Sequence, residues 1–329
     1  MDRRTLLQTG IAVGCVGLAG CLDILGDSGE GTEGDDGAND AEPAESDTAA
    51  DANGERYELT RQSGQVVSDW LLPPGAVGVD AYDVEAFTPS RLGPYRDELP
   101  PTLTELADQM HYYLTGSLPE GTTWDPISMI ATADYGWDGG TTIVARGSFE
   151  TSHLGRLVTS DELTHRSEYG GLDVYEGDND AVAFDQTTWV QTSADRPVET
   201  LERTIDAAAG DASRYADEHE PFGRLVDALP DGDVIKITDG APGLGLMDIE
   251  GAIAKSEGYA VDGAETTATE AILFETAADA TTEAGEDYLD AHRHRPAPDH
   301  ESVAITVDGQ LLVIESAIDT GDVPKIGAM

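Results

Sequence analysis

Positive charge is scarce in this sequence. Only 18 of the 329 residues are lysine or arginine, against 65 aspartates and glutamates, which gives a formal net charge of −47. Lysine occurs only at Lys236, Lys255 and Lys325. Because no basic cluster is available to meet phosphate groups, the composition argues against binding to DNA, RNA or anionic lipid head groups.

Cysteine and catalytic motifs are also scarce. The two cysteines, Cys15 and Cys21, both lie near the start, so the rest of the chain has no disulfide and no cysteine metal site. The sequence contains no nucleophile elbow, no P-loop and no dinucleotide fingerprint. These absences favour a protein that is not an enzyme and needs no cofactor.

The first 21 residues have the organisation of an export signal. Arg3 and Arg4 precede a short apolar run from Ile11 to Ala19, and small residues then lead to Cys21. The paired arginines resemble the twin-arginine signal, and residues 18–21 resemble the lipobox of lipoproteins, in which the cysteine thiol takes up the lipid. We therefore expect cleavage before Cys21 and lipid attachment there. The alternative is an ordinary basic start with an unmodified cysteine.

The acidic, lysine-poor composition resembles that of proteins from halophilic archaea. At molar salt the Debye length falls to about 3 Å, so self-repulsion is largely screened. The whole chain thus resembles the surface lipoproteins that haloarchaea export by the twin-arginine route. This resemblance implies a lipid anchor at the outer face of the cytoplasmic membrane and an extracellular globular part, but it implies no activity. A nucleic-acid mimic or an acidic partner-binding protein is the alternative explanation of the charge.

Composition and periodicity divide the chain. Residues 22–56 have almost no large apolar side chains and are predicted to be a disordered acidic linker. Further on, a spacing of three and four between apolar residues predicts a helix over Leu99–Leu114. An Asp308-Gly309 turn between two apolar runs predicts a hairpin over residues 302–316. Strands in hairpins with covering helices predict an α+β fold.

The order of these elements repeats. A leucine-proline turn precedes a strand near residues 72 and 229, and Phe-Glu-Thr joins a strand to a helix at residues 149 and 274. We therefore predict a duplicated unit of antiparallel strands with a covering helix, with copies at 57–212 and 213–318 and a loose tail at 319–329. Chance similarity in an Ala/Thr/Gly-rich sequence is the alternative.

One cluster has residue types that bind metals. His292, His294 and His300 lie within nine residues, and imidazole is a ligand for zinc and copper. The alternative is a helix end at which cationic side chains meet the negative end of the helix dipole, followed by a proline-rich loop. The neighbouring arginines, which would repel a divalent cation, favour this alternative.

The function that we expect is a non-enzymatic binding module that contacts an envelope protein or a small extracellular solute. A membrane-tethered hydrolase or metal-dependent enzyme that uses the histidine cluster is the competing hypothesis.

Overall fold

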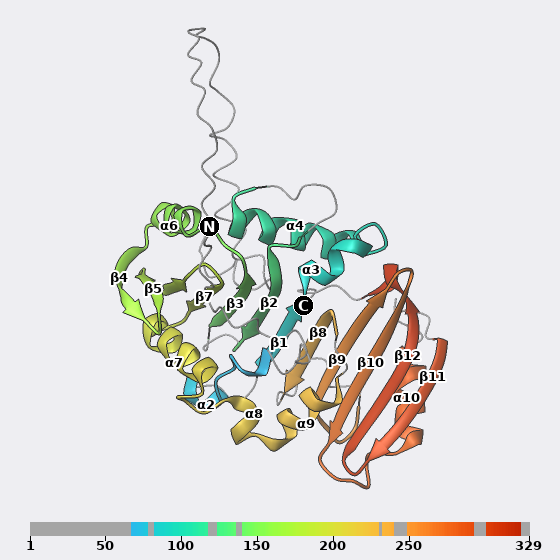
Figure 1. Ribbon diagram of the computed structural model, residues 1–329. Coiled ribbons are helices and arrows are strands. Elements are labelled where there is room, and N and C mark those ends of the chain that lie inside the picture. The colour runs from blue at the N-terminus through green and yellow to red at the C-terminus, as the bar shows by residue number, and fades with distance from the viewer. Residues whose placement is uncertain are drawn as a thin grey trace, which may run out of the picture.

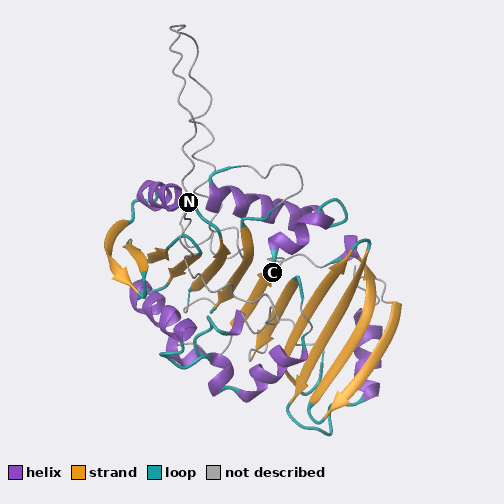
Figure 2. Ribbon diagram, viewed as in Figure 1, coloured by secondary structure: helices purple, strands orange, loops and turns teal. Residues whose placement is uncertain are grey.

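The computed structural model describes residues 67–77, 82–117, 124–135, 140–229, 232–239, 249–292 and 301–323. They form one continuous antiparallel sheet of twelve strands with helices on both faces (Figure 1, Figure 2). The predicted combination of an antiparallel sheet with helices is confirmed. Within the described ranges, no helix combines the length and the apolar composition that a membrane span needs.

The strands are β1 (Tyr82–Phe87), β2 (Ile127–Asp134), β3 (Thr141–Gly147), β4 (Thr164–Tyr169), β5 (Leu172–Glu176), β6 (Asp180–Phe184), β7 (Thr188–Ser193), β8 (Val234–Asp239), β9 (Ala252–Asp262), β10 (Glu265–Phe274), β11 (Glu301–Asp308) and β12 (Leu311–Asp319). The helices are α2 (Pro74–Val77), α3 (Pro89–Leu92), η4 (Gly93–Tyr95), α4 (Pro101–Thr115), α6 (Thr151–Ser160), α7 (Pro197–Ala209), α8 (Tyr215–Glu218), α9 (Glu220–Ala228), α10 (Thr282–His292) and η5 (Thr320–Asp322).

The strands lie in the order β11-β12-β10-β9-β8-β1-β2-β3-β7-β6-β5-β4. After β3 the chain passes through α6 and four more strands, so that β7 returns to pair with β3. After β10 it passes through α10 and two more strands, so that β12 returns to pair with β10. The two halves meet where β1 pairs with β8 in the middle of the sheet.

Each face of the sheet has its own buried core, because side chains alternate between the faces along a strand. On one face, α7, α8 and α9 contribute Leu201, Tyr215 and Phe222, which pack with strand residues such as Val84 and Ile237. On the opposite face, α4 and α6 cover the middle and the β4 end of the sheet. Helix α10 covers the β11 end of that same face (Figure 1).

Local sequence accounts for the helix ends. Pro101 and Pro197 occupy the first helical positions of α4 and α7, where the missing N–H costs nothing. Both helices end at a glycine with positive φ, Gly116 at 74° and Gly210 at 82°. The predicted helix over Leu99–Leu114 is thus confirmed as α4, and Gly210 closes α7.

Two boundaries differ from expectation. The helix expected directly after the Phe-Glu-Thr at residues 274–276 begins only at Thr282, because the Thr281 hydroxyl accepts a hydrogen bond from the Ala284 amide at 3.1 Å and caps the first turn. The expected tail is not loose over residues 319–323. Thr320 and Val323 are buried, and Asp319 caps a 3-10 turn by accepting from the Gly321 amide. Residues 324–329 lie outside the described residues.

Candidate functional site

The residues singled out by sequence lie mostly outside the described part of the chain. His292 is the last residue of α10, whereas His294 and His300 lie outside the described residues, as do Arg3, Arg4 and Cys21. The metal hypothesis and the lipid anchor therefore stay predictions. Among the described residues, no three histidine, cysteine, aspartate or glutamate side chains are placed to share a metal ion.

The feature with the clearest binding potential is the β11 edge, by which we mean the side of β11 that faces away from β12. Strand β11 is the last strand at one end of the sheet, and within the described ranges no strand pairs with its second side (Figure 1). A terminal strand presents unpaired N–H and C=O groups that another chain can use. From Ser302 to Val307 the strand contains no charged residue.

The side chains of β11 are unusually apolar for their exposure. The most exposed large apolar residues in the described ranges are three: Ile253 at 37%, Val303 at 40% and Val307 at 38%. Two of these three belong to β11. Single exposed apolar residues are ordinary, but a β-branched, uncharged terminal strand is a surface on which another strand can pair.

Helix α10 holds β11 from one face. Ile305 packs against the core that Tyr288 and Leu289 of α10 form with β10 and β12. Gly285 permits a close approach, because a Cβ atom there would lie 3.1 Å from Ile305 Cγ2 and 3.2 Å from Leu312 Cδ1. On the opposite face, Arg224 of α9 donates to the Asp308 carbonyl at 3.1 Å. The strand is thus held from both faces, while among the described residues no strand pairs with its outer edge.

A buried ion cluster lies beneath α10. Lys255 Nζ is 2.6 Å from Glu257 Oε1 and 3.0 Å from Glu270 Oε2, and it also donates to the Tyr288 hydroxyl. Tyr288 donates to Glu270, and Tyr259 donates to Glu257 Oε2 at 2.9 Å. We call these five residues the Lys255 cluster. It ties the helix to β9 and β10 through polar groups that satisfy one another.

Charge and burial set the protonation states in the Lys255 cluster. Burial alone would lower the pKa of Lys255, but Glu257 and Glu270 hold that pKa well above its usual range. Burial would raise the pKa of Glu257, yet the Lys255 ammonium brings it below the ordinary value. Burial and the two glutamates raise the pKa of Tyr259 well above 10. Lys255 and Glu257 therefore form an ionised pair at neutral pH, and Tyr259 is a neutral donor beside them.

The cluster continues as a row of charge across the middle of the sheet. Glu85 lies opposite Lys236, Lys236 opposite Glu257, and Glu257 opposite Glu270. Next to this row, burial raises the pKa of Asp83, and one of its oxygens has no hydrogen-bond partner. Such shifts occur both at functional sites and in structural ion networks. The complete pairing around Lys255 favours a structural role.

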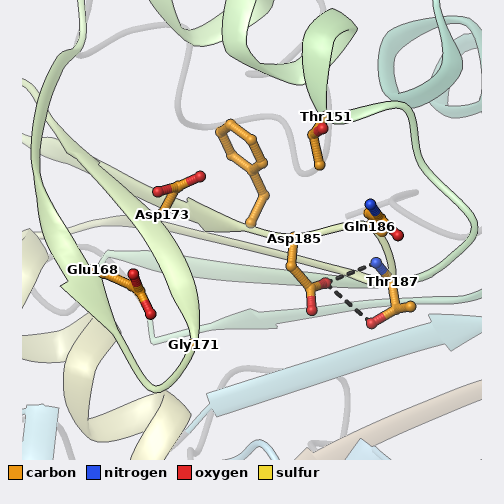
Figure 3. A pocket seen from close by; sticks show the side chains of 8 residues that line it. Thr151, Glu168, Gly171, Asp173, Asp185, Gln186 and Thr187 are labelled. Atoms are coloured by element: carbon orange, nitrogen blue, oxygen red, sulfur yellow. Dashed lines mark hydrogen bonds between the residues drawn. The ribbon is translucent and has the colours of Figure 1, made fainter. Parts of the chain in front are cut away.

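An open hollow of about 410 Å³ lies at the other end of the sheet (Figure 3). It lies between the start of α6, the β4–β5 hairpin and the β6–β7 turn, and its lining includes Glu168, Asp173 and Asp185. Asp185 is engaged in its own turn, accepting from the Thr187 amide at 2.7 Å and the Thr187 hydroxyl at 3.0 Å. A carboxylate-lined hollow of this kind would favour cations, but the side chains that line it do not converge on one point.

Known proteins offer little guidance on these features. No protein-family model matches the chain, and no curated protein matches it. Crystal form III of TP0453 is similar with a TM-score of 0.47 and 13% identity, over 77% of this chain and 96% of that chain. Crystal form I of TP0453 has a TM-score of 0.45 and 12% identity, over 76% and 94%. Likenesses at this level carry no argument about what this chain does.

Proposed function

We propose that this chain is a surface lipoprotein of a halophilic archaeon. The export signal and the lipobox support attachment through Cys21 to the outer face of the cytoplasmic membrane, and residues 22–56 would act as a spacer. Two lipid chains would make this attachment firm, since one chain alone gives only marginal binding.

Replacement of the lipidated cysteine tests the anchor. Cys21→Ser should move most of the protein from the membrane fraction to the medium, because the serine hydroxyl does not take up the lipid. Cys15→Ser is the matched control and should leave the protein at the membrane. Cell fractionation at native salt measures both, and membrane retention of Cys21→Ser would refute the anchor.

We further propose that the globular part is a non-enzymatic interaction module, and the open, apolar β11 edge is the observation that carries this proposal. A protein held at a membrane by a spacer can present such an edge to neighbouring envelope proteins. Strand addition at an exposed edge is a common way for protein surfaces to bind extended segments.

Crosslinking on intact cells tests the interaction role. Lysines are few and Lys255 is largely buried, so carboxylate-directed reagents suit this surface. Recovery of the same envelope protein in repeated experiments is the expected result. Efficient labelling with recovery of this chain alone would argue against an interaction module and favour a protein that binds a small solute.

We also propose that the sheet contains a duplicated unit, with copies near residues 57–212 and 213–318. The support is the order of elements: three antiparallel strands, then a helix (α6 or α10), then a hairpin (β6–β7 or β11–β12) whose last strand returns to the third. Helix α4 and the β4–β5 hairpin would then be additions to the first copy. Under this correspondence β11 is the counterpart of β6.

A further inference from the structure

We propose that the β11 edge accepts an extended segment of another protein as an additional antiparallel strand. That segment would carry β-branched apolar side chains at alternate positions and basic residues at its ends. This inference rests on the proposed interaction role and names the chemistry of the partner.

The backbone of β11 is arranged for such pairing. The β11–β12 hairpin has a two-residue turn, Gly309-Gln310, and Gly309 has a φ of 62°, as the first position of a type II′ turn requires. In a hairpin of this kind the hydrogen-bonded pairs alternate, starting with the pair beside the turn. The main-chain N–H and C=O groups of Ile305 and Val307 therefore point away from β12, toward the open side.

The first half of the chain shows what occupies the equivalent position. Strand β6 has a partner on each side, β7 and β5, and β5 pairs with it in antiparallel register from Asp173↔Phe184 to Glu176↔Ala181. Strand β11 has β12 on one side and, within the described ranges, no strand on the other. A bound segment would take the position beside β11 that β5 takes beside β6, and it would likewise run antiparallel to its neighbour.

Charge selects the ends of the partner. Residues 275–292 and 301–323 contain no lysine or arginine, and β11 ends with Asp308, whose carbonyl accepts from the nearby Arg224 of α9. Exposed carboxylates continue around the edge, at Glu283, Glu286 and Asp287 on α10 and at Glu315 on β12. Opposite charges facing each other across strands are favourable and like charges are not, so a segment with basic ends fits this edge.

The same charges disfavour two other occupants. A second copy that pairs along β11 would bring the exposed carboxylates of two α10 helices and two β12 strands together, in a chain whose net charge is −47. The linker of this chain, residues 22–56, is rich in Asp, Glu and Gly and has almost no β-branched apolar residue, so it would make a poor strand.

Peptide binding tests the inference on the full protein purified at molar salt. The probe is a fluorescent eight-residue peptide of alternating valine and threonine with arginine at both ends. We expect saturable binding, and we expect slower hydrogen exchange at Ile305 and Val307 when the peptide is bound. A peptide with glutamate ends should bind several-fold more weakly, and one with a central proline should not bind.

Val307→Pro removes an outward N–H without removing a hydrogen bond to β12, so it should weaken binding at least tenfold at an unchanged unfolding temperature. If that variant unfolds early, Val307→Lys is used instead, since its charge repels the arginine ends while the backbone is kept. Thr164→Pro, at the first residue of β4, is the control at the opposite edge and should bind the probe as the unchanged protein does.

Three results would overturn the inference: no binding of the probe at millimolar concentration, equal binding by Val307→Pro or Val307→Lys, or exchange protection of β11 that comes from self-association. The interaction role is judged separately by crosslinking in cells. If an envelope partner is crosslinked only at residues distant from β11, the interaction role stands and the strand-addition inference is refuted.

Discussion

The two ends of the sheet treat an exposed strand in different ways. At one end, β4 is six residues long, carries His165, Arg166 and Glu168, and has a bulge in its pairing with β5. At the other end, β11 is eight residues long and uncharged between its two ends. Its one bulge lies at its start, so the pairing from Ala304 to Asp308 is regular. Charge, shortness and bulges all discourage further strand pairing. Among the described residues, the β4 end of the sheet is therefore better protected against further strand pairing than the β11 end.

The helices that cover the two ends, α6 and α10, differ in how closely they pack on the strands. A Cβ atom added at Gly155 of α6 would meet no atom within 4 Å, whereas one added at Gly285 of α10 would press on Ile305 and Leu312. The ion pairs differ as well. Arg166 and Glu176 form an exposed pair at 2.7 Å near the β4 edge, whereas Lys255 is enclosed beneath α10. The β11 end is therefore the more rigidly supported of the two.

The largest expected difference concerns these ion pairs. Lys255→Met should lower the free energy of unfolding by about 3–5 kcal/mol, because it removes the ammonium group that lies within 3.0 Å of the buried carboxylates of Glu257 and Glu270. Arg166→Met, at the exposed pair, should cost less than about 1 kcal/mol. Denaturant unfolding at constant molar salt measures both values. Equal losses in the two variants would contradict the contrast between the ends.

A second prediction follows the Lys255 cluster with pH. The pKa of Glu257 is lowered in the folded state, so its contribution is fully present above its ordinary value of about 4.3 and is lost as the pH falls through the folded pKa. Glu257→Gln should therefore be less stable than the unchanged protein by about 1–3 kcal/mol at pH 7. Thermal unfolding should show that the difference in stability between the variant and the unchanged protein narrows below about pH 4.

Asp83→Asn is the control with the opposite sign. Burial raises the pKa of Asp83, so its charge opposes folding at neutral pH, and this opposition disappears as the pH falls through the folded pKa and on below the ordinary value. The variant should be at least as stable as the unchanged protein at pH 7, with the difference closing in acid. The same pH course for both variants would show that general acid unfolding, not the cluster, sets the trend.

The smallest expected effects concern two of the glycines in helices, Gly155 of α6 and Gly285 of α10. Gly155→Ala should stabilise the protein by about 0.5–1 kcal/mol, because alanine favours a helix and open space surrounds the position. Gly285→Ala gains the same propensity but pushes α10 away from β11, so we expect no gain, or a loss of about 1 kcal/mol. Thermal unfolding of the pair decides whether α10 is seated more tightly than α6, and equal stabilisation would show that it is not.

Sequence patterns predicted the elements that local chemistry determines. The Asp308-Gly309 pair predicted the β11–β12 hairpin, although the turn itself is one residue further on, at Gly309-Gln310, and apolar spacing predicted α4. Strand β4 was missed because its sequence, THRSEY, has no apolar alternation, and it forms a strand only because β5 lies beside it. Helices α8 and α9 were missed as well, although Phe222, Leu225 and Val226 of α9 have the spacing of three and four that is typical of an amphipathic helix.

The β11 edge could not be predicted from the sequence, because it depends on contacts between distant segments. A sequence shows that residues 301–308 form a strand, but whether the strand is terminal depends on which segments pair with it. The Lys255 cluster joins residues of β9, β10 and α10, and no spacing of residues along the chain predicts it. The one signal in the sequence was the rarity of lysine. Two of the three lysines, Lys236 and Lys255, lie in neighbouring strands near one face.

The central pairing of β1 with β8 has a consequence for synthesis. Val84 lies opposite Ile237, a residue made roughly 150 positions later. At roughly 5–20 residues per second, a ribosome needs on the order of 10–30 seconds to cover that distance. During this interval β1 lacks one of its two native neighbours, so the growing chain carries an open strand in the middle of its future sheet. The unpaired side that β11 has within the described ranges is thus a passing state at β1, which ends when the second half of the chain has been made.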